Sequence, residues 1–128
     1  MQQVKIYNHP RALPGELQAR YCDRFGCRLR GLSLRRALPQ SQGLLLVQQR
    51  ATRLDAAVHM FFMNFDLAIV WLDETKIVVD VRLAHRWRSV LMPQTAARYI
   101  LEMPTFWFDY FSVGDQIAET ILLHEGGG

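Results

Sequence analysis

The feature that most constrains this chain is the stretch HMFFMNFDLAIVWLD at residues 59–73, the most apolar part of the sequence. Its second half, Ile69-Val-Trp-Leu72, is rich in β-branched and aromatic residues and does not alternate with polar ones. Such an unbroken run predicts a strand that is covered on both faces. The first half keeps His59, Asn64 and Asp66 among apolar residues. These polar groups are either satisfied structural polars or parts of a site.

A hairpin is predicted directly after this stretch. Asp73-Glu-Thr-Lys76 is a short polar connection to a second β-rich run, Ile77-Val-Val-Asp-Val-Arg82. Two such runs around a short turn are typical of a β-hairpin. The second run alternates apolar residues with Asp80 and Arg82, which predicts that one of its faces meets water.

The other expected elements follow from helix and strand periodicity and from turn residues. A helix is expected from Cys22 or Asp23 to about Arg35, because Phe25 and Leu29 recur at helical spacing among arginines. The remaining predictions are strands at 4–7, 43–47, 57–63, 97–103 and about 116–122, a bend at 64–66, and a short helix at 105–111 capped by Thr105. The sum is an α+β fold, mostly antiparallel β, built as a small curled sheet or barrel with one or two short helices.

Length and composition predict a single domain. A chain of 128 residues, of which 50% are hydrophobic, can bury one core without metals or disulfides. We find no repeat, no low-complexity block and no linker in the sequence. We therefore expect one domain over residues 1–128, with a core from about residue 21 to 119 and a flexible tail at 125–128.

Positive and negative charges are divided unevenly along the chain. Residues 1–53 hold ten Lys or Arg against two acids (+8), and residues 54–128 hold five against ten (−5). In one compact domain these halves are expected to pair with each other, and the alternative is a basic face for an anionic partner. Nucleic acid is a weak candidate for that partner, because the arginine-rich residues 25–36 include one aromatic side chain, Phe25.

The sequence carries no pattern of a signal peptide or a membrane span. The first residues lack a charged start followed by an apolar core. The apolar run 56–72 is too short for a bilayer and contains His59, Asn64 and Asp66. We expect a soluble, cytoplasmic protein that does not bind membranes.

The two cysteines, Cys22 and Cys27, lie five positions apart. This spacing fits neither a CxxC redox pair nor half of a zinc site, because no second pair exists. In a reducing compartment we expect free thiols with buried or half-buried roles. A regulatory disulfide is the alternative.

Four pieces of the chain, in this order and spacing, resemble the DUF192 family (domain of unknown function 192). They span about residues 21 to 119 and comprise Arg28-Leu-Arg-Gly-Leu32 followed by Arg35, Gly43-Leu-Leu-Leu-Val47, His59-Met-Phe-Phe-Met63 running on to Leu72-Asp73, and Tyr99-Ile-Leu-Glu102 with Val113-Gly-Asp115. The resemblance implies a compact, mostly β fold with an N-terminal helix. It implies no activity, since the family has none established.

The chain departs from the family within its most apolar stretch. The family pattern after the His-containing run is similar to F-M-R-F-P-I-D, where this chain has Phe62-Met-Asn-Phe-Asp-Leu-Ala68. Asn64 replaces the arginine, Asp66 the proline, and Ala68 the final aspartate. If that aspartate serves chemistry in the family, this chain has moved or lost it.

No pattern of a known catalytic, metal or cofactor site is present. The four histidines show no HxH or i, i+4 pairing, and there is no glycine-rich phosphate loop, GxSxG or Cys–His nucleophile. We therefore assign no catalytic residue, metal or cofactor. For His59 the plainest interpretation is a core histidine bonded to a backbone carbonyl or carboxylate, and for Asp66 it is a structural pair with Arg28 or Arg30.

Three functional hypotheses remain. The first is a non-catalytic module that binds a small ligand or a protein partner. The second is a small hydrolase-like or lyase-like enzyme with His59 as base and Asp66 as its orienting carboxylate, which requires the two side chains to lie within hydrogen-bond reach. The third is nucleic-acid binding through the basic N-terminal half. The first predicts a binding site made by His59, Phe61, Asn64, Asp66, Arg28, Arg30, Trp87 and Arg88.

Overall fold

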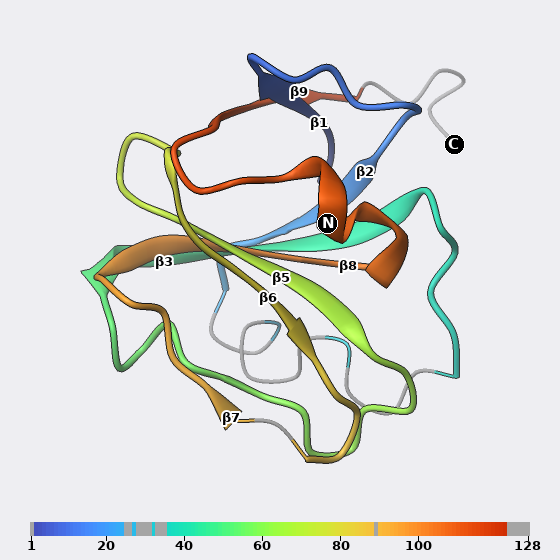
Figure 1. The fold of residues 1–128 in the computed structure, drawn as a ribbon, viewed down its shortest axis with the longest axis vertical. Coiled ribbons are helices and arrows are strands. Elements are labelled where there is room, and N and C mark those ends of the chain that lie inside the picture. The colour runs from blue at the N-terminus through green and yellow to red at the C-terminus, as the bar shows by residue number, and fades with distance from the viewer. Residues whose placement is uncertain (1, 25–26, 28–31, 33–35, 89, 123–128) are drawn as a thin grey trace.

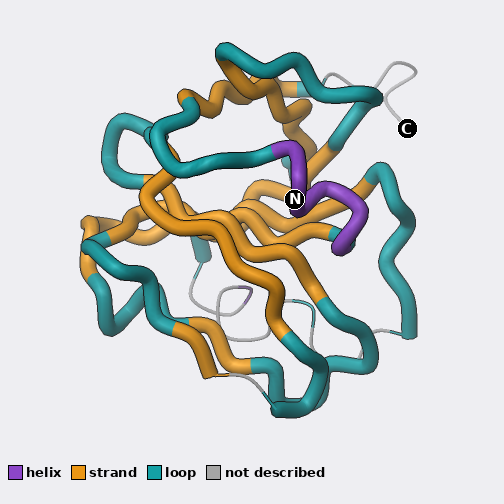
Figure 2. The backbone as a smooth tube through the Cα atoms, in the orientation of Figure 1, coloured by secondary structure: helices purple, strands orange, loops and turns teal. Residues whose placement is uncertain are grey.

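The computed structural model describes residues 2–24, 27, 32, 36–88 and 90–122. Almost all of the described secondary structure is sheet (Figure 2). The elements are β1 (Gln3–His9), β2 (Gln18–Cys22), β3 (Gln42–Thr52), β4 (Val58–His59), β5 (Leu67–Leu72), β6 (Val78–Ala84), β7 (Val90–Leu91), β8 (Ala97–Met103), the 3-10 helix η1 (Thr105–Tyr110) and β9 (Gln116–Ile121).

Seven strands form one strongly curled sheet in the order β6-β5-β8-β3-β2-β1-β9 (Figure 1). All neighbours are antiparallel except β2 and β3, which run parallel. The curl brings the two edge strands together, because Ile77 bridges Gln116 and the amide of Val78 donates to the carbonyl of Asp115 at 2.9 Å. The sheet is thus a half-barrel whose edges meet at this bridge. β4 and β7 form a separate two-stranded ribbon.

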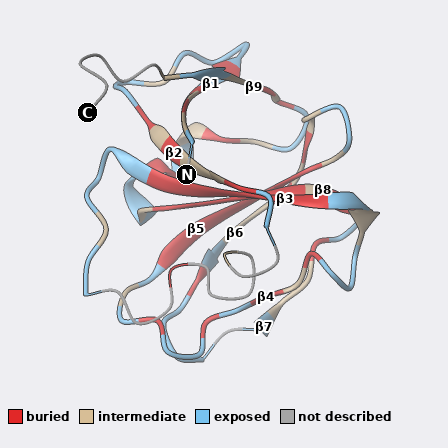
Figure 3. Ribbon diagram, turned by 180° about the vertical axis from the view of Figure 1, so that it is seen from behind, coloured by how far each residue is buried: buried red, intermediate tan, exposed pale blue. Residues whose placement is uncertain are grey.

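Two apolar cores occupy the two faces of this sheet, and the central strands between them are largely buried (Figure 3). Inside the curl, side chains from β1, β3, β5, β8 and β9 pack with Trp107 and Phe111 from the segment around η1. On the outer face, Leu44, Ile69 and Trp71 pack against residues 56–63. This explains why all six residues of β5 are buried: the strand has one core on each side, as its unbroken apolar run predicts.

Several sequence predictions are confirmed. β5 and β6 pair as an antiparallel hairpin, and in its turn one carboxylate oxygen of Asp73 accepts hydrogen bonds from the backbone amides of Thr75 and Ile77 at 2.8 and 3.0 Å. These bonds lower the pKa of the Asp73 carboxyl against the opposing effect of its partial burial, which is the larger single influence. The strands expected at 4–7, 43–47, 97–103 and 116–122 correspond to β1, β3, β8 and β9.

Other predictions need correction. The α+β label is weak, because η1 is a short 3-10 helix, preceded by Pro104 rather than capped by the Thr105 side chain. The strand expected at 57–63 is confined to β4, two residues long. Asp80, expected on a wet face, is only 5% exposed. It lies across from Trp71, on the face of the sheet that the outer core covers, and the amide of Gln94 and the guanidinium of Arg82 contact its carboxylate.

The expectation of two free thiols is wrong as well. Cys22 and Cys27 form a disulfide, with their Cα atoms 6.0 Å apart, a separation within the range that disulfides span. Disulfides persist chiefly in oxidising surroundings.

Some predictions fall outside the described residues. One is the helix expected from Cys22 or Asp23 to about Arg35, whose course the structure does not describe. The others are the roles of the Arg28 and Arg30 side chains and the tail at 125–128. Within the described ranges, no helix has the length and apolarity that crossing a lipid bilayer requires.

Candidate functional site

Two loops that are far apart in sequence meet beside the β4–β7 ribbon. The first, residues 59–66, leads from β4 into β5, and the second, residues 85–88, leads from β6 toward β7. The amide of Trp87 donates to the carbonyl of Met60 at 2.8 Å. The amide of Arg86 donates to a carboxylate oxygen of Asp66 at 2.9 Å. These two bonds fix one loop against the other, so that side chains from both form one surface.

Large apolar side chains gather on this surface. Phe61 is 47% exposed, Phe62 53%, Trp87 50% and Val90 59%. The rings of Phe62 and Trp87 meet edge to face, with centroids 5.6 Å apart, and the ring of His59 stacks on Phe61 at 5.5 Å. We call Phe61, Phe62, Trp87 and Val90 the aromatic surface. Contiguous exposed apolar side chains of this kind mark interaction sites more often than isolated ones do.

The backbone beneath the two central rings is strained. Phe62 and Trp87 both have φ of 65°, in the left-handed region that bulky residues adopt at a cost of about 1–2 kcal/mol each. Backbone strain of this kind persists only where the surrounding structure imposes it, and it concentrates at functional sites. Burial does not explain it here, because both rings are half exposed.

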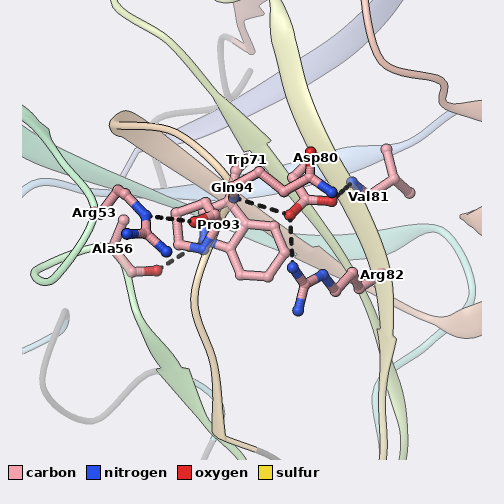
Figure 4. A network of polar contacts seen from close by, with 8 residues as sticks. All are labelled: Arg53, Ala56, Trp71, Asp80, Val81, Arg82, Pro93 and Gln94. Carbon is pink, nitrogen blue, oxygen red and sulfur yellow. Dashed lines mark hydrogen bonds and ion pairs between the residues drawn. The ribbon is translucent and has the colours of Figure 1, made fainter.

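A polar network anchors the ribbon that flanks this surface to the sheet (Figure 4). The indole nitrogen of the buried Trp71 donates to the carbonyl of Ala56 at 2.7 Å. The carboxylate of Asp80 accepts from the amide of Gln94 at 3.1 Å and lies 3.1 Å from the guanidinium of Arg82. These bonds hold the segments before β4 and after β7 against the sheet. The ribbon from which the two loops extend is therefore fixed to the sheet.

The structure brings together most of the predicted site residues but does not bury them. His59, Phe61, Asn64, Asp66, Trp87 and Arg88 all lie on the two loops or at their ends, and all are exposed. The interpretation of His59 as a core histidine is therefore wrong, as is the premise that the polar groups of this stretch are buried. A turn explains the difference. The amide of Met63 donates to the carbonyl of Met60 at 3.2 Å, and both methionine side chains fill the outer core. His59, Asn64 and Asp66 lie next to these anchors and remain exposed.

The predicted set was also incomplete. Phe62, Arg86 and Val90 belong to the same exposed region and were not selected. The sequence HRWRSV at 85–90 could have indicated this region. Two arginines flank a tryptophan there, in a segment without the alternation that is typical of a strand. Phe62 was not separable from Phe61 by sequence alone.

His59 and Asp66 do not form the acid–base pair that the enzyme hypothesis requires. No hydrogen bond or ion pair joins them. The carboxylate of Asp66 instead accepts from the Arg86 amide and lies 3.8 Å from Nδ1 of His85. A metal centre has no support from geometry either, because within the described ranges no three His, Cys, Asp or Glu side chains gather closely enough to hold an ion.

Two groups of titratable side chains lie away from the loops. Glu102 on β8 is 6% exposed, and this burial raises its pKa from 4.5 to about 7. Lys76 pairs with Glu119 and lies over the ring of Tyr99 at 5.3 Å. Burial acts to lower the pKa of Lys76, but the pair with Glu119 outweighs it and the pKa is raised. Asp115, in the predicted Val-Gly-Asp turn, accepts bonds from Asn8 and the Ser112 amide, both at 2.9 Å, a structural role.

Comparison of the sequence with known proteins finds one family and several relatives within it. The DUF192 family model, described as "Uncharacterized ACR", matches residues 8–118. UPF0127 proteins of Thermococcus kodakarensis and Thermococcus gammatolerans are 36% and 42% identical over 99 and 82 residues, which cover 77% and 64% of this chain. The matched part spans 61% and 52% of the lengths of those relatives. A UPF0127 protein of Pyrococcus abyssi is 32% identical over 99 residues, 77% of this chain and 81% of its own.

Two solved structures share the fold. A Sinorhizobium meliloti protein described as a candidate transcription regulator superposes with a TM-score of 0.78 at 15% identity, covering 92% of each chain. A Novosphingobium aromaticivorans protein of unknown function superposes with a TM-score of 0.74 at 15% identity, covering 91% of this chain and 83% of its own. At such identity the likeness establishes the fold alone.

Proposed function

The chain belongs to the DUF192 family, and from this premise we propose that it is a non-catalytic module that binds an acidic protein partner through its aromatic surface. One observation carries the proposal. Phe62 and Trp87 are half exposed, touch each other edge to face, and both sit on backbone with φ of 65°. A fold that only needed to cover its outer core would place small or polar residues at such positions.

The chemistry of the partner follows from what surrounds the rings. Arg86 and Arg88 are exposed on either side of Trp87. Their two positive charges outnumber the single carboxylate of Asp66, which accepts a hydrogen bond from the backbone amide of Arg86. An apolar centre with a basic rim is complementary to an apolar patch bordered by carboxylates. Aromatic and arginine side chains are also the residues that contribute most at protein interfaces.

The arrangement favours a protein partner over a single-stranded nucleic acid. Sequence-tolerant binding of nucleic acids uses open aromatic faces on which bases stack. Here one face of the Phe61 ring is covered by His59, with an interplanar angle of 27°, and the edge-to-face pair of Phe62 and Trp87 occupies further ring surface. The surface also projects from the fold on two loops, which suits contact with another protein surface better than enclosure of a small ligand.

The test is selection of short peptides from a random phage-displayed library on the immobilised protein, at low and at moderate salt. We expect enriched peptides that combine an apolar residue with neighbouring Asp or Glu. One enriched peptide is then synthesised. Trp87→Ala should raise the dissociation constant for this peptide at least about 30-fold, since removal of a central anchor costs about 2 kcal/mol or more. Added salt should weaken binding as well.

The matched control is Phe106→Ala. Phe106 is an aromatic residue of similar exposure, 43%, on η1, away from the two loops. The Phe106→Ala substitution should leave the affinity for the peptide unchanged. Peptides that bind the wild type and the Trp87 variant equally would overturn the proposal. Tight binding of an oligo-uridine probe that is lost in the Trp87 variant would replace the protein partner with nucleic acid.

A further inference from the structure

The two sulfurs of the disulfide differ in their access to solvent. Cys22 lies on β2, is 0% exposed and packs into the outer core with Leu46 and Leu32. Cys27 is only partly buried. Of the two cysteines, Cys27 is therefore the one that a nucleophile from solvent can approach, whereas Cys22 is closed to it.

Cys27 also forms part of a cavity. A space of about 310 Å³ is lined by Gln2, Tyr21, Asp23, Arg24 and Cys27, which is within the range of sites that hold small molecules. Among the residues that the structure describes, its walls offer an amide, a phenol and one side chain of each charge. These groups are complementary to a small zwitterion, whose carboxylate can face Arg24 and whose ammonium group can face Asp23.

We propose that this cavity admits a zwitterionic low-molecular-weight thiol, which exchanges with the disulfide at Cys27. The thiolate of the incoming molecule attacks the sulfur of Cys27 in line with the S–S bond. A new disulfide forms between the small thiol and Cys27, and the electron pair of the old bond leaves on the sulfur of Cys22, which takes a proton from water. No external oxidant or reductant is needed, because the incoming thiol is oxidised as Cys22 is reduced.

The environment of Cys22 determines what happens next. A thiol in apolar surroundings stays protonated and is a poor nucleophile. The released Cys22 therefore attacks the mixed disulfide only slowly, so the adduct on Cys27 persists against its own partner cysteine and is removed only by a second molecule of the small thiol. The same apolar surroundings make Cys22 a slow leaving group, so the adduct forms slowly and then lasts. The cavity thus functions as a modification site rather than as a reversible two-thiol switch.

The experiment uses the oxidised protein incubated with reduced glutathione at pH 8 under native conditions. After an acid quench, free thiols are alkylated in denaturant and the protein is digested and analysed by mass spectrometry. We expect one glutathione per chain, attached to Cys27, with Cys22 alkylated. Cys22→Ser, which leaves Cys27 as a single thiol, should form the same adduct with oxidised glutathione. Cys27→Ser should stay unmodified until it is unfolded.

Comparison of thiols tests the cavity itself. At equal thiolate concentration, glutathione should react several-fold faster than the neutral 2-mercaptoethanol, and Arg24→Ala should remove this preference. Equal rates for the two thiols with the wild-type protein would overturn the assignment of the cavity. Attachment at Cys22, complete reduction without an adduct, or reaction only in denaturant would overturn the exchange at Cys27.

Discussion

Replacing Glu102 by glutamine tests how strongly one buried carboxyl opposes folding at neutral pH. Glu102 lies in the centre of the sheet, directly across from Leu44 on β3 and Ile69 on β5. It is 6% exposed, and among the described residues no hydrogen bond or ion pair reaches its side chain. An ionised carboxylate in such a place loses most of its hydration, which opposes its ionisation. Glutamine keeps the shape of the side chain and removes the charge.

The magnitude follows from the pKa of this carboxyl. Burial raises it from 4.5 to about 7. The folded protein therefore holds a proton that the unfolded chain releases, and the stabilisation is complete below pH 4.5 and is lost as the pH rises to about 7. Each tenfold change in proton affinity is worth about 1.4 kcal/mol, so the full loss is about 3 kcal/mol. Most of this loss, about 2–3 kcal/mol, falls between pH 5 and pH 8.

The assay is urea unfolding at pH 5, 6, 7 and 8, followed by tryptophan fluorescence with the disulfide intact. The quantity compared is the free energy of unfolding of the variant minus that of the wild type. We expect the free energy of unfolding of Glu102→Gln to gain about 2–3 kcal/mol on that of the wild type between pH 5 and pH 8. Glu74→Gln, which removes an exposed carboxylate from the β5–β6 turn, is the matched control and should follow the wild type at every pH.

Parallel wild-type and Glu102→Gln stabilities from pH 5 to pH 8 would refute this reasoning. Such a result would mean that the carboxylate stays ionised in the folded state at no net penalty. A difference of the expected size that also appears in Glu74→Gln would refute it too, because the effect would then come from net charge and not from burial.

Substitutions at three further sites are expected to change the free energy of unfolding, each measured by urea unfolding at pH 7. Phe62→Gly should be about 1 kcal/mol more stable than Phe62→Ala, because only glycine relieves the φ of 65° while both remove the ring; equal stabilities would show that the backbone there is unstrained. Trp71→Phe should lose about 2 kcal/mol, since the carbonyl of Ala56 loses its buried indole donor, and an unchanged midpoint would contradict this. Gly43→Ala should lose about 1–3 kcal/mol, because its new methyl group would lie 2.7 Å from the backbone oxygen of Glu102; a neutral effect would show that β3 and β8 can separate locally.

The sequence by itself determined the local elements and the family. The unbroken apolar run of β5 required cover on both faces, and the polar turn at 73–76 required a hairpin with the strand that follows. β8 could be located because its apolar residues end at Pro104. These features depend on periodicity and turn chemistry over a few residues, which a single sequence displays directly.

Only the tertiary structure decided how these elements are joined and which side chains remain outside. The parallel pairing of β2 with β3 and the bridge between Ile77 and Gln116 link residues far apart in sequence, and no local pattern encodes such partners. The sequence could not predict the exposure of His59 and Phe62 or the burial of Asp80, for the same reason. Periodicity shows which side chains share a face of an element. What covers that face is set by the packing of distant segments, and here that packing left two strained aromatic residues at the surface.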